Sequence, residues 1–399
     1  MYKIESLDHY GRGIVKVDNK IVFISNALPD EIVDLKIIKE KKNYCEALVT
    51  SYIEKSKKRV EVKCPYYENC GGCDLLHLSY ENQLKFKESK IQNIVSKYFK
   101  NNIKINNIVK SDKTFNYRNK VTFQVSKKLG FYNKNSYELV EIENCLIIND
   151  LINNCIKHLN KLDLSKINRI TCRVASNDLM VIIESNFKNI NIEPLKEYAQ
   201  SIYLKVNSKY THVFGKKYIY ETIDKYKYKI SPDSFFQVNI DVCRKLYDKI
   251  KEYVKSEKKV LDLYCGTGSI GIYINEGNNV IGIEKNKYAI EDAKINKKEN
   301  NIDNIEFICG DSGKSLIDIN FTPDIIIVDP PRNGLNKETI DNIIQFNSKE
   351  IVYVSCDPMT LVRDLNQLNK FYDVIELTPF DMFPNTYHIE CLVYLKRKV

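Results

Sequence analysis

The sequence has no long hydrophobic run and no recognisable leader segment. No apolar stretch approaches the roughly 20 residues needed to cross a bilayer. No basic segment followed by an apolar one opens the chain, so a secretory signal is not expected. Internal repeats and true low-complexity tracts are also lacking, which excludes a repeat array. We therefore expect a cytoplasmic protein built from globular domains, with no membrane association and no obligate protein partner.

The length of the chain indicates how many domains it forms, and its net charge indicates what kind of molecule it binds. A chain of 399 residues is too long for one ordinary core, so two or three domains are expected. The hydrophobic content of 43% is normal for a globular protein. The net charge of +9 favours a polyanionic partner such as a nucleic acid. Lys, Asn and Ile are abundant throughout, and this general bias accounts for part of the basic character.

The twelve cysteines indicate chemistry or metal binding, because a reducing compartment disfavours disulfides. Cys64, Cys70 and Cys73 lie within one turn region, where Gly71-Gly72 allows a tight backbone. A closed metal site needs a fourth ligand. Spacing alone is compatible with zinc, and four cysteines also suit a 4Fe–4S cluster. The C-x3-C-x2-C spacing usual in radical enzymes is absent.

The first part of the chain has the pattern of a small β domain and a mixed domain. Residues 1–57 alternate short apolar strands with turn signals, which predicts an OB-like barrel of a kind that often binds RNA. Residues 58–225 predict a central α+β domain that contains the cysteine turn. The expected strands are Ile14–Val17, Ile21–Ile24, Glu31–Ile37, Glu46–Ile53, Val121–Val125, Ile170–Val174, Leu179–Ile183 and Ser201–Val206. An amphipathic helix is expected over about Tyr80–Phe99, with Leu84, Ile91, Ile94, Val95 and Tyr98 on one face.

Residues 226–399 alternate apolar strands with helical segments. This pattern predicts a doubly wound α/β domain with a parallel sheet. The expected strands are Val260–Tyr264, Val280–Ile283, Ile305–Ile308, Ile325–Val328 and Ile351–Val354.

A glycine-rich segment after the first of these strands predicts a nucleotide-cofactor site. Gly266, Gly268 and Gly271 spell G-x-G-x-x-G, and Glu284 ends the next strand, where an acid can bind ribose hydroxyls. To this point NAD and S-adenosylmethionine fit equally well. Asp311 follows the third strand, where it can bind an adenine amino group. Asp329-Pro-Pro-Arg332 resembles the motif of methyltransferases that act on planar nitrogenous rings, which favours S-adenosylmethionine.

A thiol and a carboxylate lie in the last part of this predicted domain. Cys356 follows the strand Ile351–Val354, at the edge where open α/β sheets present reactive groups. Glu390 is a candidate base. A thiolate and a base suit addition to an electron-poor ring carbon followed by proton removal and elimination. Arg363 and His388 are candidates for lowering the pKa of the thiol.

With these motifs in place, the chain resembles the RNA uracil-5 methyltransferase family, and within it the iron–sulfur 23S rRNA members. The resemblance covers nearly the whole chain. Its signatures are Cys64-x5-Cys70-x2-Cys73, Phe235-Phe-Gln-Val-Asn239, Asp262-Leu-Tyr-Cys-Gly-Thr-Gly268, Asp329-Pro-Pro-Arg332, and Ser355-Cys-Asp-Pro358 with His388-Ile-Glu390. Two positions depart from the pattern: Ser269 often appears as Asn, and Tyr387 stands where relatives more often have His.

The resemblance implies specific roles. Cys356 would add to C6 of a uridine, C5 would take the methyl group, and Glu390 would remove the C5 proton. The residues implied to bind S-adenosylmethionine are Gln237, Tyr264, Ser269, Glu284, Asp311 and Asp329. The residues implied to hold a 4Fe–4S cluster are Cys64, Cys70, Cys73 and the distant Cys145. The N-terminal barrel would be a TRAM-type RNA-binding domain, and the helix near residues 80–99 would pack on the catalytic domain.

RNA contacts are expected outside these signatures as well. The target base must be flipped or single-stranded to be reached, and Phe235, Phe236 and Tyr117 are candidates to stack on it. Arg118 and Lys120 are candidate phosphate or base contacts. Three alternatives to a 23S rRNA enzyme stay open. They are a uridine C5 methyltransferase for the tRNA T-loop, a catalytically idle RNA-binding protein, and an NAD-dependent enzyme.

Overall fold

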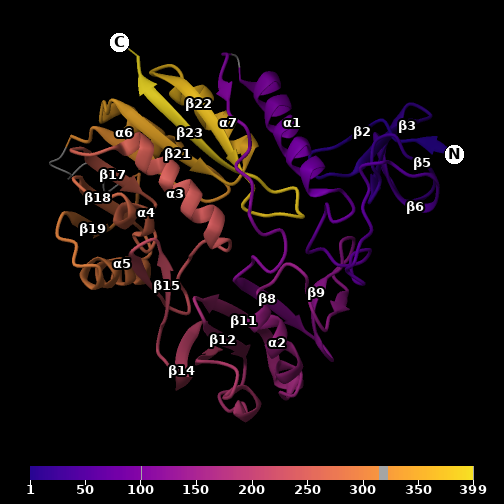
Figure 1. The fold of residues 1–399 in the computed structure, drawn as a ribbon, viewed down its shortest axis with the longest axis horizontal. Coiled ribbons are helices and arrows are strands. Elements are labelled where there is room, and N and C mark those ends of the chain that lie inside the picture. The colour runs from indigo at the N-terminus through magenta and orange to yellow at the C-terminus, as the bar shows by residue number, and fades with distance from the viewer. Residues whose placement is uncertain (100, 314–321, 399) are drawn as a thin grey trace. The chain divides into compact units, whose positions relative to one another are not determined.

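The computed structural model describes residues 1–99, 101–313 and 322–398 (Figure 1). The chain forms two compact units, each assembled from several segments. The first contains Met1–Lys90, Gly130–Ile142 and Phe383–His388, and the second contains Ile91–Leu129, Glu143–Met382 and Ile389–Val399. Division of the chain into domains at 1–57, 58–225 and 226–399 stays a prediction. Within the described residues, no helix has the length and apolar character needed to cross a membrane.

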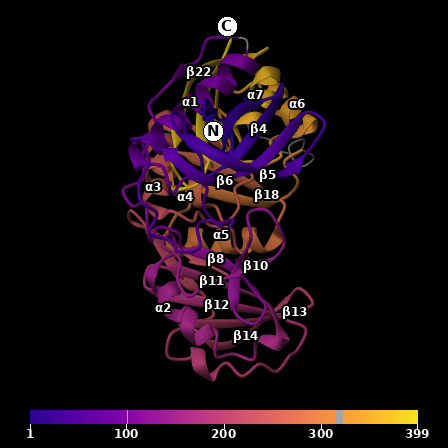
Figure 2. The ribbon, with the colours of Figure 1, turned by 90° about the vertical axis from the view of Figure 1, so that its right-hand side faces the viewer.

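The first unit begins with a mixed sheet whose strands run in the order β1-β5-β6-β4-β3-β2 (Figure 2). Its strands are β1 Tyr2–Lys3, β2 Ser6–Leu7, β3 Gly13–Val17, β4 Lys20–Ser25, β5 Ile32–Glu40 and β6 Tyr44–Glu54. Strands β4 and β6 pair in parallel, and the β5–β6 ladder has several register shifts. Alternate side chains, including Val22, Ile24 and Val33, are buried in one core. The four expected strands are confirmed, and the two-residue strands β1 and β2 were not expected.

Helix α1, Tyr80–Tyr98, matches the helix expected near residues 80–99. Ile91, Ile94 and Val95 belong to the same buried cluster as strand residues of the largest sheet, which is described below. The placement of Tyr98 on the buried face was wrong, because Tyr98 is 42% exposed and Phe99 is buried instead. A shift of one residue at a helix end is enough to turn a side chain by about 100°.

A second sheet fills the middle of the second unit, with β8, β11, β12, β13 and β14 in that order. The elements are β8 Lys120–Val125, α2 Asp150–Leu159, η1 Leu164–Lys166, β11 Ile167–Ala175, β12 Asp178–Ser185, η2 Glu193–Leu195, β13 Ser201–Val206 and β14 Lys209–Gly215. Strands β12 and β13 are parallel, and the other pairs are antiparallel. Two hairpins were not expected. The β9–β10 hairpin joins Leu129–Tyr132 to Leu139–Glu141, and the β15–β16 hairpin joins Ile219–Ile223 to Tyr226–Ile230.

The largest sheet contains eight strands in the order β19-β18-β17-β20-β21-β23-β22-β7. Strands β17 to β21 are parallel, whereas β23 runs antiparallel to both of its neighbours. The strands are β7 Lys104–Ile105, β17 Lys259–Leu263, β18 Asn279–Glu284, β19 Ile305–Cys309, β20 Ile325–Val328, β21 Glu350–Ser355, β22 Tyr372–Phe380 and β23 Glu390–Arg397. The helices are α3 Ile240–Val254, α4 Ser269–Tyr273, α5 Lys287–Glu299, α6 Lys337–Gln345 and α7 Pro358–Leu368. The five expected strands and the doubly wound parallel arrangement are confirmed.

The strand order fixes where a ligand site can form. The order changes direction between β17 and β20, and ligands of open α/β sheets bind outside the carboxyl ends of strands at such a point. Because these strands are buried on both faces, their sequences are continuous apolar runs rather than alternating ones.

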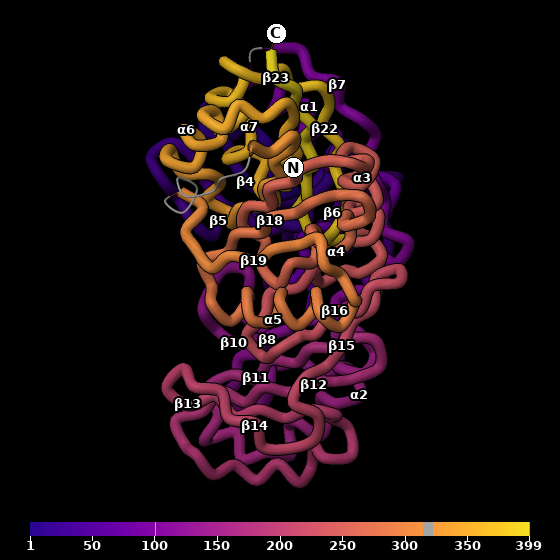
Figure 3. The backbone as a smooth tube through the Cα atoms, turned by 90° about the vertical axis from the view of Figure 1, so that its left-hand side faces the viewer, coloured from indigo at the N-terminus to yellow at the C-terminus, as the bar shows by residue number. Residues whose placement is uncertain are grey.

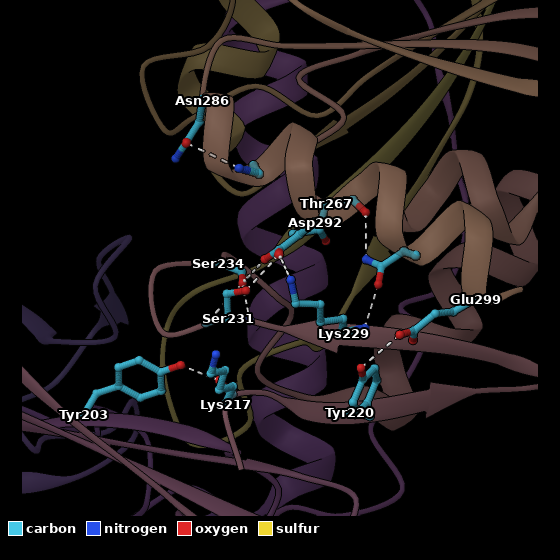
Figure 4. Close-up of polar contacts among 12 residues, drawn as sticks. Tyr203, Lys217, Tyr220, Lys229, Ser231, Ser234, Thr267, Asn286, Asp292 and Glu299 are labelled. Carbon is cyan, nitrogen blue, oxygen red and sulfur yellow. Dashed lines mark hydrogen bonds and ion pairs between the residues drawn. The ribbon is translucent and has the colours of Figure 1, made fainter. Parts of the chain in front are cut away.

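A buried polar network fastens the β15–β16 hairpin to helix α5 (Figures 3 and 4). The Asp292 carboxylate accepts from Lys229 Nζ at 2.8 Å, Ser231 Oγ at 2.8 Å and Ser234 Oγ at 2.9 Å. The Asn296 side chain accepts from the Lys229 backbone N–H and donates to the Thr267 carbonyl. Lys229 and Asp292 are both nearly inaccessible, so each ion depends on the other for its solvation.

We expect Asp292→Asn to lower the free energy of unfolding by about 3–5 kcal/mol, because it leaves the Lys229 ammonium buried without a counter-charge. Denaturant unfolding measures the change. Glu193→Gln is the control: it breaks an exposed pair with Lys196 and should cost no more than about 0.5 kcal/mol. Equal stabilities of the two variants would contradict this interpretation of the network.

Candidate active site

Strand pairing brings the candidate nucleophile and the candidate base together. In the antiparallel β21–β23 ladder, Ser355 lies opposite Cys391. Cys356 follows Ser355 and Glu390 precedes Cys391, so both come directly after this last pair of the ladder, and the charge of Glu390 acts on the Cys356 thiol. Residues directly opposite each other on neighbouring strands have Cβ atoms about 4.5–5.5 Å apart. Glu390 is buried at 4% exposure, whereas Cys356 stays partly accessible to a substrate.

Asp329 adds a second carboxylate to this edge of the sheet. Its strand β20 pairs in parallel with β21, and Val328 lies opposite Tyr353. Burial raises the pKa of Asp329 to about 7. Burial also raises the pKa of Glu390 well above its usual value, and the charge of Asp329 raises it further. Two acids in one desolvated site are therefore harder to ionise than they would be in water.

The same surroundings keep the thiol protonated. Burial raises the pKa of Cys356 to about 11, with the charges of Glu390 and Asp329 acting in the same direction. Arg332 opposes this shift and is the cation that favours the thiolate. Its guanidinium also favours the charged form of Glu390.

The sequence did not reveal which cation acts on the Cys356 thiol. Arg332 stood in the Asp329-Pro-Pro-Arg332 motif, but its effect on the thiol was not predicted. Arg363, a candidate for that role, is engaged elsewhere. Its guanidinium donates to Asp364 Oδ1 and to the carbonyls of Asn333 and Leu335.

The glycine-rich segment after β17 forms an open turn. Tyr264 and Gly266 have φ angles of +62° and +54°, and nothing lies within 4 Å of where a Cβ of Gly266 would stand. Gly268 has φ +76°, and a Cβ there would lie 2.3 Å from the Phe307 ring. Gly268 is therefore required by packing, while Gly266 leaves space for a ligand.

Acidic residues follow the ends of the neighbouring strands. Glu284 accepts from the backbone N–H groups of Gly266 at 3.3 Å and Asn286 at 2.8 Å, so the acid is fixed beside the open turn. Asp311 accepts from the Gly313 N–H at 2.9 Å and lies 3.1 Å from Lys285 Nζ. The two carboxylates thus stand at the ends of adjacent strands, β18 and β19.

The remaining residues proposed to bind the cofactor are held by their own neighbours. The Ser269 hydroxyl lies 2.7 Å from the Tyr247 hydroxyl, and the Tyr264 hydroxyl lies 3.2 Å from Thr339 Oγ1. Gln237 is buried, and its backbone carbonyl accepts a hydrogen bond from the Asn119 side chain at 3.1 Å. Tyr247, Thr339 and Asn119 support these positions but carried no motif that could have revealed them.

Of the three aromatic residues expected to stack on a base, only Phe235 is exposed, at 66%. Phe236 is buried and packs against Tyr228, and Tyr117 is buried as well. A base can therefore reach Phe235 without rearrangement, whereas Phe236 and Tyr117 contribute to the core.

The cysteine turn of the first unit gathers three thiols around one lysine. Burial lowers the pKa of Lys134, and its ammonium interacts with Cys64, Cys70 and Cys73. The Gly72 N–H lies 3.4 Å from Cys70 Sγ. In the part of the chain that the structure describes, no three His, Cys, Asp or Glu side chains are arranged to hold a single metal ion. Cys145 belongs to the second unit, where the Asn153 side chain bonds its backbone. The donor set thus suits a thiolate-ligated cluster in its chemistry, but the arrangement is not that of a single-ion site.

Comparisons with known proteins show the family to which the chain belongs. The model of the tRNA (uracil-5-)-methyltransferase family matches residues 79–398, and that of the TRAM domain matches residues 3–50. The chain belongs to the tRNA (uracil-5-)-methyltransferase family. The N-terminal sheet is its TRAM domain, and the C-terminal sheet is its Rossmann-like domain.

Two curated relatives are similar to this chain over nearly its whole length. An uncharacterized RNA methyltransferase of Clostridium acetobutylicum is 36% identical over 445 residues, covering 99% of this chain and 96% of the relative. One from Aquifex aeolicus is 36% identical, with 99% and 98% covered. Among solved structures, the Pyrococcus abyssi tRNA (uracil-54, C5)-methyltransferase in complex with S-adenosyl-L-homocysteine has a TM-score of 0.83 at 28% identity. That match covers 99% of this chain and 100% of the other.

Because burial raises the pKa of Cys356 to about 11, the free enzyme should contain little thiolate at neutral pH. We expect the rate of Cys356 alkylation by iodoacetamide to rise about tenfold per pH unit from pH 7 to 10. Arg332→Gln should slow alkylation throughout this range, because it removes the cation that favours the thiolate. Peptide mass spectrometry measures both rates. A rate that levels off by pH 8 would show that the thiol pKa is close to its ordinary value.

Proposed function

We propose that this protein transfers a methyl group from S-adenosylmethionine to C5 of a uridine in 23S rRNA. The observation that carries the proposal is the pairing of β21 with β20 and β23, because it brings Cys356, Asp329 and Glu390 to neighbouring strand ends where the two carboxylates act on the thiol. An idle RNA-binding protein would have no need to bury two carboxylates beside an accessible thiol. Membership of the tRNA (uracil-5-)-methyltransferase family supports the same reaction and argues against an NAD-dependent enzyme.

The chain's residues would act in three steps. Cys356 loses its proton to solvent, and the thiolate forms a bond to C6 while the C5–C6 π electrons move toward O4. C5 of the resulting enolate would then form a bond to the methyl carbon while the bond from that carbon to the sulfonium sulfur breaks, and S-adenosyl-L-homocysteine would leave with the electron pair. Glu390 takes the C5 proton, the C5–C6 double bond re-forms, and the bond from C6 to sulfur breaks to return the Cys356 thiolate.

The electrostatics of the site suit the last of these steps. A carboxylate whose pKa is raised is a stronger base once it is ionised, and the pKa of Glu390 is raised by burial and by Asp329. The Arg332 charge favours the ionised form of both Cys356 and Glu390. One cation thus assists both residues at the moments when each must be negative.

Gln237, Tyr264, Ser269, Glu284, Asp311 and Asp329 would hold S-adenosylmethionine, which supplies an electrophilic methyl group when bound. The open turn at Gly266 and the fixed Glu284 carboxylate fit such a ligand. The complex of the Pyrococcus abyssi relative with S-adenosyl-L-homocysteine supports the same cofactor.

The tRNA T-loop is the second candidate substrate. The predicted N-terminal barrel and the cysteine turn favour an rRNA substrate, because many tRNA enzymes of the family lack both features. The match to a tRNA (uracil-54, C5)-methyltransferase covers 99% of this chain, so the overall architecture does not separate the two substrates. Nucleoside mass spectrometry of products from unmodified 23S rRNA fragments and tRNA transcripts tests them side by side. A 5-methyluridine signal from rRNA that is lost in Cys356→Ala supports the proposal. A signal from tRNA alone would favour the second candidate, and no signal from either RNA would contradict both.

We expect Glu390→Gln to stop the reaction after methyl transfer, because the amide cannot take the C5 proton. The variant should accumulate a covalent complex with ordinary uridine RNA that withstands a denaturing gel, while turnover falls by at least about 100-fold. Asp373→Asn is a matched control, since Asp373 is an exposed acid on β22 that forms an exposed ion pair with Lys398. Normal turnover by Glu390→Gln would assign proton removal to another residue.

We further propose that Cys64, Cys70, Cys73 and Cys145 hold a 4Fe–4S cluster with a structural role, since methyl transfer to an enolate requires no electron. In such a cluster each thiolate ligates a different iron, so the thiols need not converge on one ion.

We expect anaerobically purified protein to contain about four irons and four sulfides per chain and to absorb broadly in the visible range. Cys70→Ser should lose most of this iron, whereas Cys309→Ser, at an exposed cysteine outside the turn, should retain it. Elemental analysis and sulfide assay give the result. About one zinc per chain with no sulfide would contradict the cluster and favour a zinc site.

A further inference from the structure

Two cationic side chains lie next to each other on one face of the sheet that contains β8 and β11. Lys120 on β8 and Arg173 on β11 are direct cross-strand partners, so their side chains project from the same face. Arg173 is only 2% exposed. Burial lowers the pKa of Lys120 to about 8, and the charge of Arg173 lowers it further. Like charges directly opposite each other destabilise a sheet, so this arrangement requires an explanation.

The Arg173 guanidinium is only partly satisfied. One of its terminal nitrogens, Nη1, donates to the Ser234 carbonyl at 2.6 Å. The other, Nη2, is buried and has no hydrogen-bond partner among the described residues. Asp292 attracts Arg173, but that carboxylate already accepts from Lys229, Ser231 and Ser234. Figure 4 shows Lys229, Ser231 and Ser234 converging on Asp292.

The Lys120 ammonium also lacks a direct counter-ion. Asp233 acts on it electrostatically, yet within the described ranges Lys120 forms no ion pair. The Asp233 carboxylate instead accepts from the Tyr210 hydroxyl at 2.8 Å. The sheet therefore places the partly buried Lys120 beside a buried guanidinium whose Nη2 group has no acceptor among the described residues. This set of donors matches the oxygens of a phosphate.

The position of the pair connects it with the candidate active site. Asn119, next to Lys120, donates to the Gln237 carbonyl, and Arg173 holds Ser234 in the same segment. That segment carries the exposed Phe235 and ends at Asn239, the N-cap of α3. Cys243 in the first turns of α3 interacts with the charges of Asp329 and Glu390. Residues 231–239 thus connect the cation pair with α3, the helix whose Cys243 interacts electrostatically with the two carboxylates.

We propose that Lys120 and Arg173 form a binding site for a backbone phosphate of the RNA, close to the nucleotide whose base reaches Cys356. The proposal rests on the proposed RNA methylation. A phosphate contact positions the strand and carries no sequence information, so this site fixes the register of the RNA relative to Phe235.

Fluorescence anisotropy of labelled 23S rRNA fragments and tRNA transcripts, over a series of salt concentrations, tests the proposal on the full chain. Lys120→Gln should raise the Kd about tenfold and reduce the slope of log Kd against log salt by about one. Lys120→Arg should bind within about twofold of the wild type, because it keeps the charge. Lys205→Gln is the matched control. Lys205 is a partly buried lysine of the same sheet that pairs with Glu184, so its loss should leave Kd and slope unchanged.

Unchanged binding by Lys120→Gln, binding by Lys120→Arg as weak as by Lys120→Gln, or no RNA binding by the wild type would each overturn the phosphate site. Equal melting temperatures and equal S-adenosylmethionine affinities show that the variants are folded. The binding assay needs no methyl transfer. Loss of affinity in Lys120→Gln with no 5-methyluridine from any RNA would therefore reject the proposed function and keep the phosphate site.

Discussion

The antiparallel pairing of β21 with β23 is the constraint on which the catalytic site depends. Strand β21 ends one residue before Cys356 and β23 begins with Glu390, and the last pair of the ladder, Ser355 opposite Cys391, brings these two ends together. A slip of one residue would turn Glu390 to the other face of the sheet. The pairing is well determined, because β23 is bonded on both sides and most of its side chains are buried. The fold thus positions two groups that are 34 residues apart in sequence by extending an ordinary sheet.

Desolvation gives this edge its chemical character. Asp329, Glu390 and Cys356 all have raised pKa values for the same reason, which is the burial of groups that would be charged in water. The result is a site in which the ionised forms are disfavoured and in which Glu390 is a stronger base once it ionises. Arg332 is the cation that opposes this tendency for both the thiol and Glu390. Between the β15–β16 hairpin and α5, by contrast, the buried charges of Lys229 and Asp292 form a direct ion pair.

Much of this arrangement follows from the sequence, because it depends on local patterns. Continuous apolar runs identified β17 to β21, and the motifs at their ends identified Cys356, Glu284 and Asp329. Strands β22 and β23 were not expected, because an antiparallel pair appended to a parallel sheet breaks the alternation of strand and helix. Tyr98 was assigned to the wrong face, because helical periodicity does not fix the last residue of a helix. The role of Arg332 depends on burial and distance, which no single-sequence pattern records.

The most direct test of the account is a covalent complex with RNA that contains 5-fluorouridine, formed in the presence of S-adenosylmethionine. Fluorine at C5 cannot be removed as a proton, so the bond between sulfur and C6 should persist through denaturation and digestion. Peptide mass spectrometry should then find the methylated fluorouridine attached to Cys356 in the wild type and no such peptide in Cys356→Ala. An adduct on a different residue, or none while S-adenosylmethionine and RNA are both bound, would contradict the central claim that Cys356 is the nucleophile.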